Sequence, residues 1–337
     1  MPPSFFMCKV LPRSLAKRPK VCYDGIQNIH EMDKGETNMS SNKRIDVIGV
    51  QMDLGASRRG VNMGPLAIRH CGLLKKLEDL GYEPRDCGDI VPNAPQSDGD
   101  PTMHHCKEVC ESNSRLYQRT CESIKDGAMP VILGGDHSIA AGSIPAVADS
   151  LGKIGIIWID AHGDFNNDES SPSGNMHGMP LSAVCGCGPD AMVSFARASR
   201  SVDPKNAVLV GSRDLDENER KRLRQYGVTV FSMNDVDKLG MAEVMRRAIQ
   251  IAGEGTEGIH VSFDVDAVTP EFAPGTGTPV HSGLTVREAF LAAEMLFECG
   301  DVVSFDMVEV NPMLDTCNKT GVLACELILS MLGKTLY

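Results

Sequence analysis

The chain has 337 residues, with 33 basic and 45 acidic side chains that give a formal net charge of −12 at pH 7. This balance lacks the basic footprint of a nucleic-acid-binding protein, and no apolar run reaches the roughly 18 residues that a membrane-spanning helix requires. Size alone would permit two domains, but α/β folds of this length are often single. Neither a linker nor an internal repeat follows Arg44, so we expect one domain over residues 44–337.

The first 43 residues differ from the rest in their charge. No acidic residue occurs up to Tyr23, whereas the same stretch carries five basic ones: Lys9, Arg13, Lys17, Arg18 and Lys20. This pattern partly resembles a mitochondrial transit peptide, although a disordered tail, or a start site placed too early with Met39 as the later candidate, would also explain it. We expect a disordered or targeting extension over residues 1–43. The protein would be cytoplasmic, or mitochondrial if the extension is a transit peptide.

Twelve cysteines are many for this chain. Because the chain is long and has no secretory-type apolar segment near its start, we expect reduced thiols. Cys106 and Cys110 lie close in sequence to His104 and His105, a grouping that would suit a metal. No second cluster accompanies it, so we expect a helix with partly buried thiols there.

Apolar runs typical of buried strands alternate along the chain with helix-like stretches. Such runs lie at 131–133, 156–159, 258–263 and 302–308. In 241–251, by contrast, apolar residues recur at helical spacing, which predicts a helix with one face in the core. Strands that alternate with helices predict an α/β fold with a mostly parallel sheet covered on both sides. In such a fold the carboxyl ends of the strands meet at one edge, where ligands bind.

Three acidic strings accompany these apolar runs: GGDHS at 134–138, DAHGDFN at 160–166 and SFDVDAV at 262–268. Side chains alternate faces along a strand, so Asp160 and His162 point the same way. Asp264 and Asp266 repeat that spacing. Packed together without a cation, these acids would repel one another and be poorly solvated. One such string is common by chance and a lone strand-end aspartate usually caps or turns the chain, but three after apolar runs favour a bound metal.

Six side chains of the kinds that bind metals would gather at this edge: His137, Asp160, His162, Asp164, Asp264 and Asp266. Because they exceed what one ion usually takes, we expect bridging carboxylates and two metals, about 3.5–4 Å apart. The strings contain no cysteine, which argues against a structural zinc site and for an ion that accepts oxygen ligands, such as manganese. Cobalt, iron and nickel remain alternatives.

The motifs match a known family. The chain resembles the arginase branch of the ureohydrolases from about Arg44 to the C-terminus. The resemblance rests on motifs in the expected order: GGDHS, DAHGDFN, SPSGNMHGMP at 171–180, SRDLDENE at 212–219, FDVDAV, PGTGTPV at 274–280 and VEVNP at 308–312. It implies a three-layer α/β/α fold and hydrolysis of a guanidinium group with two Mn²⁺ per subunit. It also implies a homo-oligomer, a trimer or hexamer, with no nucleic acid and no membrane as a partner.

The resemblance further implies how the metals are held. Each ion would have one histidine and one aspartate of its own, and both would share two bridging aspartates. The separate pairs would be His137 with Asp164 and His162 with Asp266, and the bridges would be Asp160 and Asp264. A water shared by the two ions would lose a proton near neutral pH and attack the guanidinium carbon.

The remaining roles also come from the resemblance. His177, in a glycine-flanked loop, would pass a proton to the leaving amine, because histidine titrates near neutral pH. Glu309 would pair with the cationic guanidinium, and Thr278 would support it with a hydroxyl. At the far end of the substrate, the contacts would be Asn166 and Ser173 for the carboxylate and Asp216 for the ammonium, with Asp214 and Glu219 close by. Asp136 would orient its neighbours rather than bind metal.

The string SGNMHG looks like arginase rather than agmatinase, because agmatine has no carboxylate and needs no Asn166–Ser173 pair. We therefore expect hydrolysis of L-arginine to L-ornithine and urea. Agmatine or another guanidino compound as substrate, and a non-catalytic homologue, are the alternatives. Two positions depart from the family pattern: Thr269 stands where the family often has aspartate, and Asn167 where many members have threonine. A threonine still caps or turns the chain, so we expect the geometry to survive with some local loss.

Overall fold

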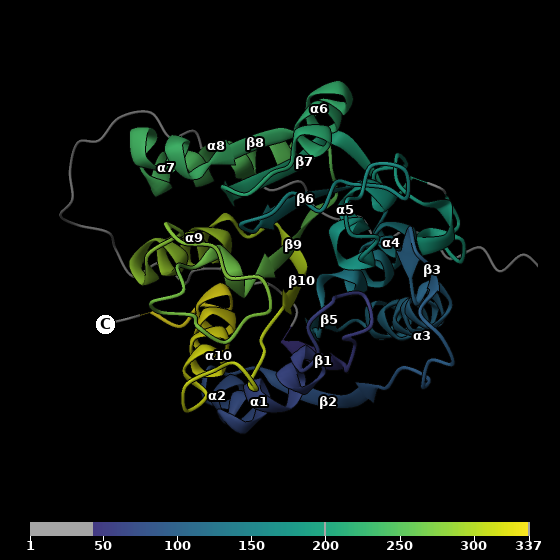
Figure 1. The fold of residues 1–337 in the computed structure, drawn as a ribbon. Helices are drawn as coiled ribbons and strands as arrows, with labels where there is room; N and C mark the ends of the chain where they lie inside the picture. The colour runs from purple at the N-terminus through teal and green to yellow at the C-terminus, as the bar shows by residue number, and fades with distance from the viewer. Residues whose placement is uncertain (1–42, 199, 336–337) are drawn as a thin grey trace, which may run out of the picture. The chain divides into compact units, whose positions relative to one another are not determined.

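A single eight-stranded sheet runs through the computed structural model, which describes residues 43–198 and 200–335 (Figure 1). Its strand order is β2-β1-β5-β10-β9-β6-β7-β8, and every neighbouring pair is parallel. The strands are β1 (Arg44–Val50), β2 (Glu83–Ile90), β5 (Met129–Leu133), β6 (Ile154–Ile159), β7 (Val202–Ser212), β8 (Thr229–Ser232), β9 (Gly258–Asp264) and β10 (Val302–Val308). A separate antiparallel pair joins β3 (Gly99–Asp100) to β4 (Met103–His104).

Helices cover both faces of the sheet, as Figure 1 shows. One face packs against α1 (Gly64–His70), α2 (Leu73–Asp79), α7 (Met233–Leu239), α8 (Met241–Gly253), α9 (Val286–Cys299) and α10 (Lys319–Met331). The other packs against α3 (Cys106–Lys125), α4 (Ala140–Leu151), α5 (Pro180–Val184) and α6 (Glu217–Tyr226). Short 3₁₀ turns lie at Val61–Met63, His137–Ile139, Met176–Gly178, Asp190–Val193 and Val265–Ala267.

The central strand β6 explains why both faces need a cover. All its residues are buried, and they divide between the two apolar clusters. Ile157 and Ile159 belong to the cluster with α7–α10, and Ile156 and Trp158 to the cluster with α3–α6. Alternate side chains of a strand face opposite sides, so an uninterrupted apolar run requires helices on both.

The order of the strands contains a jump that positions the site. After β5 the chain passes through α4 and returns as β6, three places along the sheet. The two intervening places are filled by β10 and β9, which come much later in the sequence. A change in the direction of winding of this kind opens a crevice at the carboxyl ends of the strands, where α/β proteins bind ligands.

The fold expected from the sequence is confirmed. The four apolar runs lie in β5, β6, β9 and β10, and 241–251 lies in α8 with Met241, Val244 and Ala248 buried. Cys106 and Cys110 are half-buried on α3, as expected. Among the described residues, no helix is both long and apolar enough to cross a membrane. The extension expected over residues 1–43 lies outside the described residues, apart from residue 43.

Candidate active site

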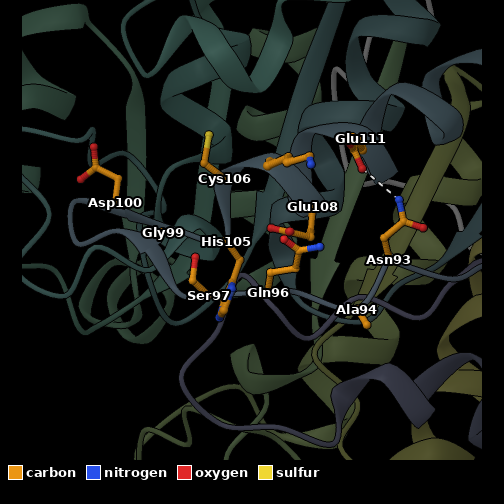
Figure 2. A pocket seen from close by; sticks show the side chains of 11 residues that line it. Asn93, Ala94, Gln96, Ser97, Gly99, Asp100, His105, Cys106, Glu108 and Glu111 are labelled. Atoms are coloured by element: carbon orange, nitrogen blue, oxygen red, sulfur yellow. Dashed lines mark hydrogen bonds between the residues drawn. The ribbon is translucent and has the colours of Figure 1, made fainter.

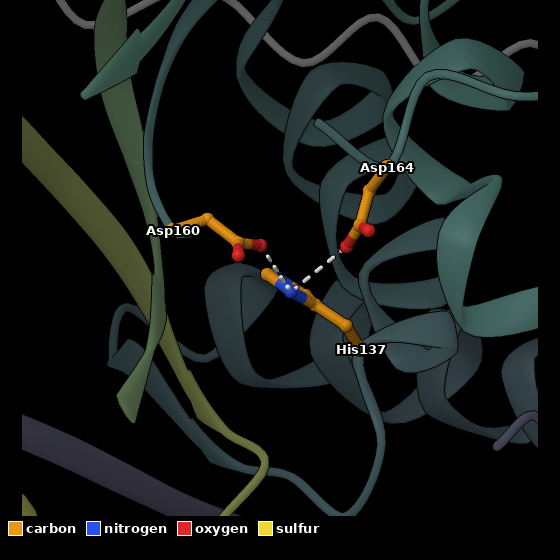
Figure 3. Close-up of side chains that lie close together, drawn as sticks. All are labelled: His137, Asp160 and Asp164. Carbon is orange, nitrogen blue, oxygen red and sulfur yellow. Dashed lines mark ion pairs between the residues drawn. The ribbon is translucent and has the colours of Figure 1, made fainter. Parts of the chain in front are cut away.

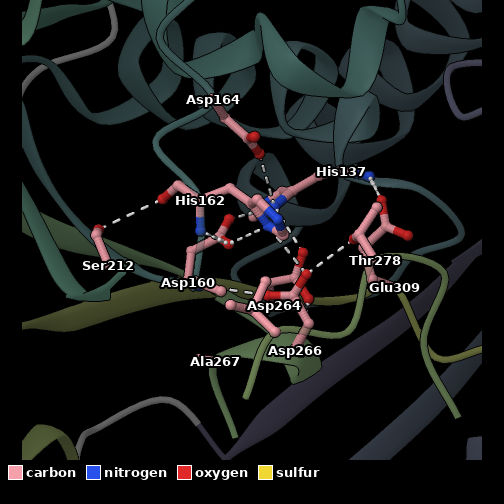
Figure 4. A network of polar contacts seen from close by, with 12 residues as sticks. His137, Asp160, His162, Asp164, Ser212, Asp264, Asp266, Ala267, Thr278 and Glu309 are labelled. Atoms are coloured by element: carbon pink, nitrogen blue, oxygen red, sulfur yellow. Dashed lines mark hydrogen bonds and ion pairs between the residues drawn. The ribbon is translucent and has the colours of Figure 1, made fainter. Parts of the chain in front are cut away.

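The candidate site lies at the carboxyl ends of five neighbouring strands, as Figure 4 shows for most of its side chains. Asp264 is the last residue of β9, and Asp160 and Glu309 directly follow β6 and β10. His137 comes four residues after β5, and Asp214 two residues after β7. Strands far apart in the sequence therefore deliver these side chains to one place, which is what the positions of the acidic strings predict.

The second glycine of GGDHS allows another loop to approach closely. A Cβ atom on Gly135 would lie 1.7 Å from the carbonyl oxygen of Met52, so no other residue fits there. The next residue, Asp136, accepts hydrogen bonds from the backbone N–H of Gly55 (2.8 Å) and of Ser138 (3.1 Å). Asp136 thus ties the loop after β1 to the start of the site, which agrees with an orienting role.

His137 is almost fully buried and points at three carboxylates, and Figure 3 shows two of them, Asp160 and Asp164. Its Nδ1 atom lies 3.1 Å from Asp160 Oδ2, 3.1 Å from Asp164 Oδ2 and 3.3 Å from Asp264 Oδ2. On the far side of the ring, Nε2 lies 2.8 Å from the hydroxyl of Ser262. If the Nε2 proton is donated to Ser262, Nδ1 presents a lone pair to the carboxylates.

His162 forms a second group on the other side of Asp160. Its Nδ1 atom lies 3.4 Å from Asp160 Oδ1 and 3.1 Å from Asp266 Oδ2. The two groups whose ligand atoms lie close enough for one ion are His137–Asp160–Asp164 and Asp160–His162–Asp266. Asp160 belongs to both. Asp264 reaches the first group through His137, and its Oδ1 accepts the backbone N–H of Asp266 at 2.7 Å.

These residues fit a pair of divalent cations. Nδ1 of His137 is buried and forms no hydrogen bond with any described residue, although three carboxylate oxygens surround it. Burial, reinforced by neighbouring carboxylates, raises the pKa of Asp164 to about 6 and that of Asp264 well above its ordinary value. A buried group of acids around an imidazole nitrogen is incomplete without positive charge. Oxygen and imidazole donors without thiolate suit manganese and related ions.

Two of the site residues adopt a backbone conformation that side chains other than glycine rarely take. Asp164 has φ 49° and Glu309 has φ 64°, both in the left-handed region. Such a conformation costs on the order of 1 kcal/mol or more and persists where the surrounding structure enforces it, often at functional sites. At Asp164 it provides the turn by which the carboxylate follows Asp160 and His162 into the cluster.

A pocket of about 310 Å³ opens beside the cluster. Five predicted site residues line it: His162, His177, Asp214, Thr278 and Glu309. Its other lining residues are Ala56, Ser57, Arg58, Gly277, Pro279 and Val280. Thr278 connects pocket and cluster, because its hydroxyl donates to Asp266 Oδ2 at 3.0 Å. The pocket therefore combines two imidazoles, two carboxylates, two hydroxyls and a guanidinium.

His177 and Glu309 form an ion pair in this pocket. Nδ1 of His177 lies 3.1 Å from Glu309 Oε1, and the same oxygen accepts the backbone N–H of His137 at 2.9 Å. Burial lowers the pKa of His177, but the hydrogen bond and charge of Glu309 outweigh burial and raise that pKa to about 9. Near neutral pH, the paired imidazole is thus protonated and can serve as an acid.

Most of the residues expected to contact the far end of the substrate do not line this pocket. Asn166 donates to Asp216 Oδ2 at 2.7 Å, and Asp216 also caps α6 by accepting the backbone N–H of Glu219 at 2.9 Å. The buried Glu219 accepts the backbone N–H of Phe165 at 2.9 Å, and Ser173 is exposed. None of these four residues lines the 310 Å³ pocket, whereas Asp214 does.

Thr269 and Asn167, the two departures from the family pattern, both take part in turns. The hydroxyl of Thr269 donates to Glu271, and its carbonyl accepts the backbone N–H of Phe272 and of Ala273. Asn167 accepts the backbone N–H of Ser170 through its side chain at 3.0 Å. A turn is therefore formed with threonine at position 269.

Some residues of the site were not expected from the sequence. Arg58 lines the pocket, Ser262 orients His137, and Trp158 stacks on His137 with ring centroids 4.0 Å apart. Arg58 lies in a loop after β1, and the rule that strand ends carry function could have drawn attention to it. Ser262 and Trp158 lie inside apolar runs, where the sequence offers no signal that distinguishes them from core residues.

A larger cavity, of about 700 Å³, lies elsewhere, around the first turns of α3 (Figure 2). Asn93, Gln96, Asp100, His105 and Cys106 are among its lining residues, and none of the predicted site residues is. Asp100, Glu108, Glu111 and His105 line it, but among the described residues none of them belongs to a group whose ligand atoms lie close enough together for one ion.

Comparison with known proteins agrees with this geometry. A sequence model described as the arginase family matches residues 43–333. The arginase of Bacillus caldovelox is 46% identical over 297 residues, which cover 87% of this chain and 99% of that protein. The arginase of Bacillus subtilis is 44% identical over 294 residues, with the same coverage. A solved structure of the Bacillus caldovelox arginase superposes with a TM-score of 0.84 at 45% identity, covering 87% of this chain and 99% of that one. The resemblance expected from the motifs is confirmed, and the chain belongs to the arginase family.

Proposed function

We propose that this protein hydrolyses L-arginine to L-ornithine and urea with two Mn²⁺ per subunit. The observation that carries the proposal is the position of the His177–Glu309 pair, which lines the same pocket as His162 of the acid–imidazole cluster. A place for a cationic planar group therefore lies directly beside the proposed metals. Membership of the arginase family supports the same reaction.

The metal ligands would be those expected from the sequence. His137 and Asp164 would hold one ion, His162 and Asp266 the other, with Asp160 and Asp264 shared. The common membership of Asp160 in both groups supports its bridging role. Bound manganese would lower the pKa of a water molecule and so supply a nucleophile near neutral pH.

Glu309 would receive the guanidinium of the substrate. Its carboxylate is buried and held in place by the N–H of His137, so little reorganisation is needed when a cation arrives. A carboxylate and a guanidinium form strong, charge-assisted hydrogen bonds. Thr278, whose hydroxyl points to Asp266, would support the same end of the substrate.

His177 would supply the proton that the reaction needs. As the bond between the guanidinium carbon and the side-chain nitrogen of arginine breaks, that nitrogen must gain a proton to leave as an amine. The guanidinium competes with His177 for Glu309, which weakens the contact that raises the pKa of the imidazole. The proton of His177 is thereby released toward the leaving nitrogen at the moment when the substrate is in place.

The far end of the pocket supports arginine over agmatine. Arginine carries a carboxylate that agmatine lacks, and Arg58 brings a cation to the lining. Among the described residues, no carboxylate forms an ion pair with Arg58, whereas the neighbouring Arg59 pairs with Asp53 at 2.9 Å. We propose Asn166 and Ser173 as further carboxylate contacts. Asp214, Asp216 and Glu219 would lie around the ammonium.

Release of urea tests the function. Purified full-length protein with manganese should release urea from L-arginine and little from agmatine. Turnover of agmatine but not arginine would replace the proposed substrate, as turnover of another guanidino acid would. If the protein binds manganese but releases urea from none of these compounds, it is better explained as a non-catalytic homologue.

Assembly and location remain proposals from the sequence. We propose a homo-oligomer, a trimer or hexamer, that binds neither nucleic acid nor membranes. Light scattering coupled to size-exclusion chromatography would measure the mass of the particle, and a monomer would contradict the proposal.

We also propose that residues 44–337 form the catalytic domain in the cytoplasm, preceded by an extension over residues 1–43. If the extension is a transit peptide, the protein is mitochondrial instead. Fractionation of cells that express the full chain, with and without residues 1–43, distinguishes the two locations.

A further inference from the structure

The indole of Trp158 touches two of the proposed metal ligands. Trp158 lies on β6, two residues before Asp160, and is fully buried. Its ring stacks on that of His137, with centroids 4.0 Å apart and an angle of 9° between the planes. Its Nε1–H donates to Asp160 Oδ2 at 2.9 Å. One side chain therefore contacts ligands from β6 and from the loop after β5, strands that are not neighbours in the sheet.

These contacts fix the orientation of Asp160. Its Oδ2 accepts the indole N–H, and its Oδ1 accepts the backbone N–H of His162 at 2.7 Å. With each oxygen held by a separate donor, the carboxylate plane cannot rotate freely. Because Asp160 belongs to both metal groups, its orientation determines where both ions lie relative to each other.

The same indole limits the movement of His137. The ring is held at its edge by Ser262, through Nε2, and on one face by Trp158. Nδ1 therefore stays directed at the carboxylates even when they repel one another. An ordinary core aromatic residue would fill the same space, but a buried indole also needs a hydrogen-bond partner. Here that partner is a ligand carboxylate rather than a structural carbonyl.

We propose that Trp158 is a positioning residue of the metal centre, which holds His137 and Asp160 in the arrangement that binds two cations. The inference rests on the proposed metal centre and goes beyond it, because it assigns a role to a residue that binds neither metal nor substrate. Residues that orient metal ligands typically contribute about 10- to 100-fold to metal affinity.

The variant Trp158→Phe tests the hydrogen bond. Phenylalanine keeps an aromatic ring against His137 but has no N–H for Asp160. We expect Mn²⁺ to bind the metal-stripped variant about tenfold more weakly or worse, as measured from the free Mn²⁺ signal in electron paramagnetic resonance. Phe305→Leu is the matched control, because Phe305 is a fully buried aromatic residue of β10 in the opposite apolar cluster. It should lower the melting temperature and leave Mn²⁺ affinity unchanged.

The unaltered protein gives an independent readout. Trp158 is the one tryptophan of the chain, so its fluorescence reports on this position alone. Titrating the metal-stripped protein with manganese chloride should quench the emission and saturate at two ions per chain. If Trp158→Phe fails to fold, this titration decides, and emission that stays constant while Mn²⁺ binds would overturn the proposal.

The outcomes separate this inference from the proposed function. Wild-type protein that binds no Mn²⁺ and releases no urea would end the proposed function itself. Wild-type protein that binds Mn²⁺, together with a folded Trp158→Phe variant of equal affinity, would end only the role of Trp158. An equal loss of affinity in Phe305→Leu would likewise show that the effect is general loosening of the core.

Discussion

Nδ1 of His177 lies 3.1 Å from the carboxylate of Glu309, inside the pocket that adjoins the acid cluster. The proposed proton donor and the proposed guanidinium partner are therefore in contact before any substrate arrives. When substrate binds, its guanidinium must replace the imidazolium of His177 at Glu309. The charge of His177 is therefore linked to whether the pocket is occupied.

Replacing His177 by alanine should lower kcat by about 10²- to 10⁴-fold, the usual contribution of a positioned acid or base. Bound manganese should remain, because His177 belongs to neither metal group. Urea release and metal content, measured on the same preparation, check this. Turnover at the wild-type rate would remove the proposed role of His177.

Glu309→Gln keeps the shape of the side chain and removes its charge. Loss of one partner of a buried charged pair costs about 2–5 kcal/mol, so kcat/KM for L-arginine should fall at least about 30-fold. Steady-state kinetics measure the change, and circular dichroism should show an unchanged fold. If the variant binds and turns over arginine normally, the guanidinium lies elsewhere.

The pKa of His177 should be visible in the metal-stripped protein. Burial lowers that pKa, but the hydrogen bond and charge of Glu309, together with the charges of Asp164 and Asp136, raise it to about 9, so in Glu309→Gln the midpoint should fall. Since the folded-state pKa is raised, the pair stabilises the fold fully below about pH 6.5, and this contribution disappears as the pH rises through 9.

NMR titration of the imidazole and denaturant unfolding of both proteins measure these two effects. The difference in unfolding free energy between wild type and Glu309→Gln should shrink between pH 6.5 and 9. A difference that is constant over this range would show that the pair is not charged in the way described.

Removal of metal should destabilise the protein, because its buried carboxylates then lack a counter-charge. Free Mn²⁺ at one hundred times its dissociation constant adds about 2.7 kcal/mol per site, which corresponds to a rise of roughly 5 °C or more in Tm. Calorimetry with chelator and with added Mn²⁺ measures the shift. In Asp266→Asn, the rise in Tm on adding Mn²⁺ should be smaller than in the wild type. An equal rise would place the ions outside this cluster.

Arg58→Ala should discriminate between substrates. Loss of an exposed ion pair costs up to about 1 kcal/mol, so kcat/KM for L-arginine should fall about fivefold, while that for agmatine should not fall. Arg59→Ala is the control, since Arg59 pairs with Asp53 and is not part of the pocket lining. Equal losses for both substrates would mean that Arg58 does not meet the carboxylate.

Local sequence patterns were sufficient for the fold and for the acid cluster. An apolar run that leads directly into Asp160, His162 and Asp164 marks the end of a buried strand and supplies metal-binding side chains at that end. Parallel strands end at one edge, so the three strings were expected at that edge. The sequence could predict this because each string and its strand are contiguous.

The parts that were missed depend on partners distant in sequence. Trp158 has the pattern of an apolar strand residue, and its role depends on the position of His137, which the fold brings over its ring. Arg58 enters the pocket because of how the loop after β1 packs on Gly135 and Asp136. The hydrogen bond between Asn166 and Asp216, both of which we propose as substrate contacts, is likewise a choice of rotamer that spacing does not encode.

The position of β9 and β10 near the end of the sequence has a consequence for biosynthesis. A nascent chain that has emerged only as far as β8 has His137 and Asp160 but lacks Asp264 and Asp266, and the two places between β5 and β6 are vacant. Pairings between segments so distant in sequence form slowly, since a long loop must close first. Most of the polypeptide must therefore be made before the second group and the proposed bridge Asp264 are complete, which makes completion of the two-metal centre a late step of maturation.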